Sequence, residues 1–262
     1  MEKEELYYLS LTNQTTKIRI DMLAHTIHNF NEDSLNRQYG FVKSSYNGIP
    51  VMFNPNLAGG VHFFKQRFPK KKLVIHHTAG AIWGDIPTLI TPSKVSTAFV
   101  ISPKGTIYML FNPWNWAFHL GRTALGGNGK QSQESIGIEI SNFGFLVRRG
   151  DTLYTYMGRP YCKINETQFY IKIDKPWKNY EYFCRYTDEQ YEALKTLKDK
   201  LCSLYRIPDV LFPEIHTTNN SNVINFQGIT THNNFRQDKF DVSPIFDWSR
   251  LFDNEQDLLT NI

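Results

Sequence analysis

A short apolar run that ends in two histidines constrains the fold of this chain more than any other stretch. Residues 73–75 are Leu-Val-Ile, which is typical of a strand buried on both faces. The Thr-Ala-Gly at 78–80 indicates an exit loop, so His76 and His77 lie at the end of the strand. Side chains alternate between the faces of a strand, so only one of these histidines can point at a given site. In open α/β sheets, ligands bind beside this end of the strands.

The composition is that of a globular protein. The 262 residues are 41% hydrophobic and 15% aromatic, which is enough to build a sizeable core. No run approaches the length of about eighteen apolar residues that indicates a membrane span. The first five residues are acidic, where an export signal would be basic and then apolar. We therefore expect synthesis in the cytoplasm without a signal peptide, and no membrane partner.

The charge of the chain is mildly basic, at +4 with a pI near 8.8. Lysines and arginines are scattered, and this diffuse excess does not predict a nucleic-acid partner. The one tight cluster, at 70–72, is interpreted as a solvated face. Cys162, Cys184 and Cys202 follow no metal-binding or disulfide spacing, so we expect reduced, structural thiols.

Residues 1–70 are interpreted as an extension placed before the main sheet. Apolar residues recur at helical spacing over 18–30, which predicts a helix that packs one face. His25 and His28 lie three residues apart on this helix. That spacing would suit a metal, but an inert pair on the helix surface is the expected case.

Two hairpins are expected from turn residues between apolar runs. Asn47 and Gly48 predict a tight turn, and Pro50 would restrict the strand that follows to an edge of its sheet. Further along, the runs at 95–101 and 106–110 flank a Ser-Pro-Lys-Gly turn, which predicts a second hairpin.

An aromatic loop at 114–121 follows the second hairpin and runs into a glycine-rich segment. It contains two tryptophans, of which Trp116 is one, and His119. Tryptophans in such a place form a wall for a sugar or peptide, or they cover the core. The loop by itself leaves both interpretations open.

The segment 135–141 alternates strictly between apolar isoleucines and other residues, which predicts a strand. Gly137, Glu139 and Ser141 share one face of it. Burying an unpaired charge is costly, so Glu139 is either salt-bridged or lines a cleft. In a cleft its pKa would be raised, and it could act as a proton shuttle.

Residues 142–185 are aromatic and strand-like, and we interpret them as an inserted β-rich excursion. Its turns are expected at 149–151, 158–160 and 174–176.

A helix is predicted after this insertion. Thr187 caps it, Gln190 completes a capping box, and Pro208 ends it. Its buried stripe is expected to consist of Tyr191, Leu194, Leu197, Leu201 and Leu204.

A second histidine, His232, again follows a short apolar strand, and Asp241 comes nine residues later. With His76 they supply the ligand types of an open zinc site, which has three protein ligands and a fourth position for water. Spacing alone does not select these ligands, because Asp238 and His77 fit equally well.

Two further residues complete the chemistry that such a site would need. Glu139 could accept a proton from the attacking water and hand it to a leaving amine. Lys239, two residues before Asp241, could stabilise the oxyanion of a tetrahedral intermediate.

Six motifs follow one another along the chain: Leu73-Val74-Ile75-His76, Val95-Ser96 through Gly105-Thr106-Ile107-Tyr108, Phe118-His119-Leu120-Gly121, Ser135-Ile136-Gly137-Ile138-Glu139, Thr187-Asp188-Glu189-Gln190-Tyr191, and His232 with Lys239-Phe240-Asp241 and Phe246-Asp247-Trp248. In order and approximate spacing they resemble the type 2 N-acetylmuramoyl-L-alanine amidases. That family includes bacteriophage amidase lysozymes, bacterial muropeptide amidases and peptidoglycan recognition proteins. The match covers roughly residues 70–250, apart from the insertion, and six motifs in register are far more specific than one.

The resemblance implies a set of roles for matched positions. His76, His232 and Asp241 correspond to the zinc ligands of the family. Glu139 corresponds to the catalytic glutamate of the bacterial branch, and Lys239 to the basic residue two positions before the third ligand.

The chain also departs from the family pattern. After the Val-Ser of the hairpin, the family often has an aromatic residue or a histidine, sometimes a tyrosine that assists catalysis, whereas this chain has Thr97 and then alanine. The usual Trp-His-Ala-Gly is Phe-His-Leu-Gly here, and the resemblance puts its His119 near the substrate cleft. We expect His119, Trp116 and Thr97 to contact substrate, and His77 to point away from the metal.

These observations predict an α/β fold with a central mixed β-sheet flanked by helices. The N-terminal extension (1–70) would precede one catalytic domain (71–262) with a β-rich insertion at about 142–185. The expected function is zinc-dependent hydrolysis of the amide between N-acetylmuramic acid and L-alanine in peptidoglycan, by a monomer that lyses bacterial cell walls as phage endolysins do. The alternatives are a non-catalytic peptidoglycan-binding protein and a phage structural protein that uses this domain only to dock.

Overall fold

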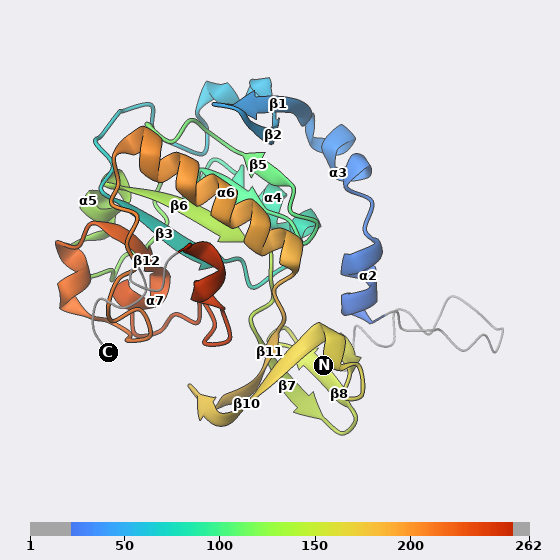
Figure 1. Ribbon diagram of the computed structural model, residues 1–262. Coiled ribbons are helices and arrows are strands. Elements are labelled where there is room, and N and C mark those ends of the chain that lie inside the picture. The colour runs from blue at the N-terminus through green and yellow to red at the C-terminus, as the bar shows by residue number, and fades with distance from the viewer. Residues whose placement is uncertain (1–21, 254–262) are drawn as a thin grey trace.

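A seven-stranded mixed sheet forms the centre of the molecule (Figure 1). The computed structural model describes residues 22–253. In spatial order the strands are β1 (Val42–Tyr46), β2 (Ile49–Phe53), β5 (Ile107–Met109), β4 (Phe99–Ile101), β6 (Ser135–Ile140), β3 (Lys72–His77) and β12 (Gly228–Thr231). Strands β12, β3, β6 and β4 are parallel, whereas β5 is antiparallel to β4 and β1 to β2. The expected α/β fold with a central mixed sheet is confirmed.

Strand β3 lies within the parallel part of the sheet. All six of its residues are buried, as the apolar run predicted. Leu73 pairs in register with Ile136 of β6 and with Ile229 of β12, and all three belong to the main core. Because β12, β3 and β6 are parallel, their carboxyl ends meet at one edge of the sheet.

Helix α6 (Asp188–Tyr205) lies across one face of this sheet (Figure 1). It begins with the predicted capping box, in which Thr187 and Gln190 each accept a hydrogen bond from the other's backbone N–H. The predicted stripe is buried except for Leu204, which is 39% exposed. Tyr205 takes the buried position instead, because its hydroxyl reaches that of Tyr46 at 2.7 Å.

The other helices that the structure describes are short. They are α2 (Leu23–Asn29), α3 (Glu32–Tyr39), α4 (Ile82–Leu89), α5 (Asn128–Gln133), α7 (His232–Phe235) and the 3-10 helices η1 (Pro55–Gly59), η2 (Thr167–Phe169), η3 (Ser221–Ile224) and η4 (Trp248–Leu251). Within residues 22–253, no helix has the length and apolar character needed to cross a membrane.

The predicted hairpin around Asn47 and Gly48 is present, and both residues have positive φ angles, of 50° and 92°. The expectation that Pro50 places the second strand at an edge is wrong, because β2 also pairs with β5 and β1 forms the edge. Pro50 is tolerated because that pairing involves only Met52 and Phe53, further along the strand. Part of the 1–70 extension is therefore built into the central sheet.

Helix α2 packs on the insertion, away from this hairpin. Its Leu23 and Ala24 belong to the core of the insertion. The predicted helix over 18–30 lies partly outside the described residues, and its described part ends at Asn29. His25 Nε2 contacts Glu166 Oε1 at 2.6 Å, so this histidine holds the helix to the insertion.

The insertion folds as a separate five-stranded antiparallel sheet. Its strands, in spatial order, are β10 (Tyr170–Trp177), β11 (Tyr180–Cys184), β7 (Phe145–Arg149), β8 (Thr152–Thr155) and β9 (Pro160–Lys163). The expectation of a turn at 174–176 is wrong. That segment continues β10 through an irregularity, and the chain turns at Lys178 and Asn179, whose φ angles are 50° and 71°. All three cysteines are free and buried, as expected.

The second predicted hairpin is present but shorter than expected. Its first strand, β4, is limited to Phe99–Ile101 and pairs with β5. Residues 95–98 instead bond to neighbouring segments, since the Ser96 N–H donates to the Phe118 carbonyl and the Ala98 N–H to the Gly137 carbonyl. This places Ser96 to Ala98 between the aromatic loop and β6.

The lysine cluster at 70–72 does not form the expected solvated face. Lys70 and Lys72 are only 5% and 1% exposed. The Lys70 ammonium donates to two backbone carbonyls, and that of Lys72 donates to two carbonyls and to Gln131 Oε1. These oxygens replace water, so the two lysines can be buried while Lys71 pairs with Glu134 at the surface.

Candidate metal centre

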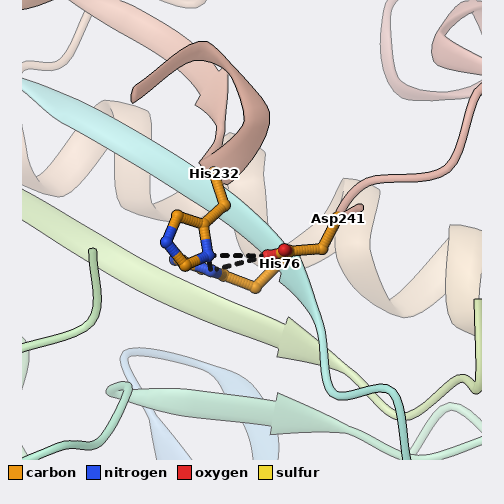
Figure 2. Close-up of side chains that lie close together, drawn as sticks. All are labelled: His76, His232 and Asp241. Atoms are coloured by element: carbon orange, nitrogen blue, oxygen red, sulfur yellow. Dashed lines mark hydrogen bonds and ion pairs between the residues drawn. The ribbon is translucent and has the colours of Figure 1, made fainter. Parts of the chain in front are cut away.

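Three polar side chains from separate segments converge at the carboxyl edge of the sheet (Figure 2). His76 Nδ1 lies 3.1 Å from His232 Nδ1 and 3.1 Å from Asp241 Oδ2. His232 Nδ1 lies 2.9 Å from the same Asp241 oxygen. The structure thus brings together the three residues that the sequence analysis assigned as ligands.

The backbone fixes each of these residues. His76 lies in β3, and His232 is the first residue of α7, directly after the parallel strand β12. Asp241 lies in the loop that follows α7. Asn233 ties this loop back to the helix, since its backbone N–H donates to the Asp241 carbonyl and its side-chain amide donates to the Val242 carbonyl, both at 2.9 Å.

Burial and the contacts within the cluster set the charges of His76 and Asp241. His76 is 1% exposed, and burial lowers its pKa to about 4, so its ring is neutral near pH 7. Burial alone would raise the pKa of Asp241, but attraction to His232 and hydrogen bonds from both histidines hold that pKa well below its usual range. A neutral His76 ring and an ionised Asp241 carboxylate are the protonation states that a metal ion requires of such ligands.

The outer ring nitrogens of both histidines are also engaged. His76 Nε2 lies 3.0 Å from His119 Nδ1, and His232 Nε2 donates to the Leu120 carbonyl at 3.0 Å. Outer hydrogen bonds of this kind fix the tautomer and orientation of metal-binding histidines. Each histidine therefore points its Nδ1 atom toward Asp241 and toward the other histidine.

His119 is held between the cluster and strand β6. Its Nε2 lies 2.9 Å from Ser135 Oγ, which in turn donates to the Gln131 carbonyl at 2.6 Å. A Cβ atom at Gly137 would lie 3.1 Å from the His119 ring, so this glycine provides the space that the ring occupies. His119 borders the cavity described below, but its main contacts support His76.

Glu139 lies beside His76, because the two residues pair in register on the parallel strands β6 and β3. Its Oε2 atom is buried and has no hydrogen-bond partner within the described residues. Burial raises its pKa well above the usual range, and the carboxylates of Asp241 and Asp85 add to this effect. An unpartnered buried carboxyl oxygen next to the cluster is suited to hold or move a proton.

The cluster and Glu139 line a cavity of about 450 Å³. Lys239 and Asp238 also line it. Asp238 was the alternative third ligand that spacing alone could not exclude. It pairs with Arg236 at 2.6 Å and lies outside the cluster. The cavity is therefore lined by the three candidate ligands, Glu139 and Lys239 together.

Two predicted substrate contacts lie away from this cavity. Thr97 is 1% exposed and bonds to the Phe99 carbonyl, and Trp116 is 6% exposed and stacks on Phe64 with ring centroids 4.3 Å apart. Neither borders the cavity, so the structure favours the core-covering interpretation of Trp116. His77 is buried and contacts the Tyr186 hydroxyl, as expected for a histidine turned away from the cluster.

Some residues of the site were missed. Ser135 shares the alternating face of Gly137 and Glu139, so strand periodicity could have placed it here. The Leu120 carbonyl had no such signal, because any residue type offers the same backbone oxygen.

The insertion packs against the loop that contains Lys239 and Asp241. Phe240, between them, lies among three aromatic rings of the insertion. Its ring centroid is 4.9 Å from that of Phe145, 5.8 Å from that of Trp177 and 5.7 Å from that of Tyr180. The Lys178 ammonium donates to the Lys239 carbonyl and lies over the Phe240 ring. No pattern in the sequence indicated this contact, because it joins segments that are far apart in the chain.

Comparisons with known proteins agree with this geometry. A model of the family described as N-acetylmuramoyl-L-alanine amidase matches residues 66–241, which is more than half of the chain. The comparison with curated proteins found no match.

Similar folds occur among solved structures. One is AmiD from E. coli in complex with the substrate anhydro-N-acetylmuramic acid-L-Ala-D-gamma-Glu-L-Lys, with 21% identity and a TM-score of 0.46 over 80% of this chain and 64% of AmiD. The chain thus spans less than two thirds of that protein. An AmpD derivative is also similar, with 21% identity and a TM-score of 0.42 over 73% of this chain and 89% of AmpD. PlyL has 17% identity and a TM-score of 0.42 over 74% of this chain and 86% of PlyL. The family match over residues 66–241 shows that this chain belongs to the type 2 N-acetylmuramoyl-L-alanine amidases.

Proposed function

We propose that this protein is a zinc-dependent hydrolase that cleaves the amide between N-acetylmuramic acid and L-alanine in peptidoglycan. The observation that carries the proposal is the convergence of two imidazole nitrogens and one carboxylate oxygen within 2.9 to 3.1 Å of one another. Zinc bonds of about 2.0 to 2.1 Å in a tetrahedron separate the ligand atoms by about 3.3 Å, close to this spacing. Three protein ligands and an open fourth position are the arrangement of catalytic rather than structural zinc.

The position of Glu139 supports hydrolysis. A zinc ion held by His76, His232 and Asp241 would polarise the amide carbonyl and increase the acidity of a water molecule. Glu139, whose Oε2 has no other partner in residues 22–253, takes the proton of the attacking water as the new C–O bond forms. It then gives that proton to the nitrogen of L-alanine as the C–N bond breaks. Its raised pKa allows it to hold the proton between these steps.

Lys239 would complete the site from the loop of the third ligand. It lines the same cavity as Glu139 and Asp241. Its ammonium group would stabilise the negative charge that develops on the carbonyl oxygen during attack. A leaving amine and an N-acetylmuramic acid carboxylate are the expected products.

The substrate is proposed to be a muramyl peptide. The substrate named in the AmiD complex has a γ-linked D-glutamate after L-alanine. We propose that this chain accepts stem peptides of the same chemistry and that it lyses bacterial cell walls. The non-catalytic alternative has less support, because all three ligand residues and Glu139 are present at one cavity.

Digestion of purified peptidoglycan tests the proposal. Mass spectrometry should detect stem peptides that begin with a free L-alanine amine, and a suspension of cell walls should lose turbidity. The protein should contain about one zinc ion per chain, and a chelator should remove both zinc and activity. Cleavage between sugars or within the stem peptide would overturn the proposal.

A further inference from the structure

A second cavity, of about 370 Å³, adjoins the metal cavity. The two cavities share five lining residues, which are Thr78, Ala79, Glu139, Phe143 and Tyr156. Glu139 thus lies at their junction. A substrate whose scissile amide lies at Glu139 would extend from one cavity into the other.

The walls of the second cavity come from helix α4 and from the insertion. Trp83 and Leu89 of helix α4 form one side. The turn between β8 and β9 of the insertion also lines the cavity and contributes Tyr156, Met157 and Arg159. Tyr156 and Met157 are 53% and 52% exposed, although both are large and apolar. Exposed apolar side chains that line a cavity beside a reactive centre are typical of a ligand-binding wall.

One cationic side chain, that of Arg159, lines this cavity. Arg159 is exposed and forms no ion pair within residues 22–253. The one acidic side chain besides Glu139 among the lining residues, Asp85, is buried and accepts hydrogen bonds from Thr78 and Ser141. A free guanidinium group at the rim therefore favours a carboxylate ligand.

The two sides of the proposed substrate differ in charge, which decides the occupant. The sugar side carries hydroxyl and acetamide groups and is neutral. A γ-linked glutamate after L-alanine uses its γ-carboxyl group in the chain and leaves its α-carboxylate free. We propose that the second cavity binds the stem peptide and that Arg159 pairs with this α-carboxylate. The inference rests on the proposed amidase function and adds a specificity-determining residue from the insertion.

Kinetics on paired substrates test this inference. The acidic substrate is the muramyl peptide N-acetylmuramoyl-L-Ala-D-γ-Glu-L-Lys, and its partner carries an amide in place of the α-carboxylate. Arg159→Gln should raise KM for the acidic substrate about tenfold and leave kcat nearly unchanged, because it removes a charge-assisted hydrogen bond remote from the reacting atoms. On the amidated substrate, Arg159→Gln and the wild-type protein should behave alike. Arg159→Lys should retain part of the preference.

The control is Arg149→Gln, which removes the same charge from the insertion at a position outside both cavities. It should leave both KM values unchanged. Equal effects of Arg159→Gln on the acidic and amidated substrates, or no effect on either, would refute the subsite. If the wild-type protein cleaves neither substrate, the amidase proposal fails. The subsite is then tested by calorimetry, which compares the affinities of the acidic and amidated peptides for wild type and Arg159→Gln.

Discussion

The central sheet and the insertion sheet border the same cavity but contribute to it in different ways. The central sheet places His76, His232 and Glu139 through the register of adjacent parallel strands. The insertion has its own core and contributes through side-chain packing on Phe240 and through an exposed turn at 156–159. One region fixes reacting groups, and the other shapes their surroundings.

This difference reflects the precision that each task needs. Ligand atoms must lie within a few tenths of an ångström of their positions, and a hydrogen-bonded ladder buried on both faces provides this. Substrate recognition by a wall and a charged turn tolerates more movement, because contacts there are individually weak. Substitutions in the central sheet should therefore have larger effects than those in the insertion.

The largest effect is expected for Asp241→Ala. It removes one of the three proposed ligands and leaves two buried histidines without their carboxylate. Zinc binding should be lost, and turnover should fall by roughly three orders of magnitude or more. Elemental analysis and amide hydrolysis assays measure the two effects. Asp238→Ala is the matched control. Asp238 is exposed and pairs with Arg236, so the Asp238→Ala protein should keep its zinc. Full zinc content in Asp241→Ala would exclude Asp241 as a ligand.

Glu139→Gln separates the chemistry from the metal. The substitution keeps the shape of the side chain but removes its ability to accept a proton, so turnover should fall by about 10² to 10⁴-fold while zinc remains bound. The thermal midpoint should not fall, because the buried carboxyl group has a raised pKa and no hydrogen-bond partner for Oε2 within the described chain. Glu134→Gln, at the surface, serves as control. Unchanged turnover in Glu139→Gln would rule out the proton-transfer role.

The same contrast explains what could be predicted from the sequence. Buried parallel strands leave a clear pattern, so 73–75 and 135–141 were recognised, and the strand ends pointed to His76 and His232. Glu139 was found because a carboxylate is out of place in an apolar strand. Asp241 came from the family resemblance, since its loop has no periodicity and Asp238 fitted the spacing equally well.

The errors concern interactions between segments that are distant in sequence. Lys70 and Lys72 form part of a charged run, and only the carbonyls of other segments make their burial possible. The turn at Lys178 and Asn179 contains no glycine or proline, so the nearby Pro176 was the stronger signal. Trp116 could have lined a cleft or covered the core, and its stacking on Phe64 favours the second interpretation.

His119→Leu should have an intermediate effect, on metal affinity. It removes the group that contacts His76 Nε2 and leaves Ser135 without that neighbour. Loss of such an outer contact weakens metal binding by about 10 to 100-fold. Competition with a chelator of known affinity measures this, and His119→Asn should recover part of the loss, because its side-chain oxygen can accept a hydrogen bond. His62→Gln, at another buried histidine, should leave zinc affinity unchanged. Unchanged zinc affinity in His119→Leu would assign this residue to substrate alone.

The smallest effect is expected for Trp177→Ala, which tests the insertion side of the comparison. It removes one of the rings around Phe240 and leaves every ligand and Glu139 in place. The loop of Asp241 should become more mobile, so kcat/KM should fall by only about two to fivefold, at unchanged zinc content. The free energy of unfolding should fall by about 1 to 2 kcal/mol for a partly buried aromatic ring.

Trp114→Ala is the matched control for this contact. Trp114 is 40% exposed and packs on Tyr205 of helix α6, away from the insertion. Its loss should affect stability by a similar amount but leave kcat/KM unchanged. If both variants lose the same activity, the effect of Trp177 is one of general stability. If Trp177→Ala instead loses zinc as fully as Asp241→Ala, the insertion fixes the ligand loop as strictly as the central sheet fixes its strands, and the division of tasks between the two sheets does not hold.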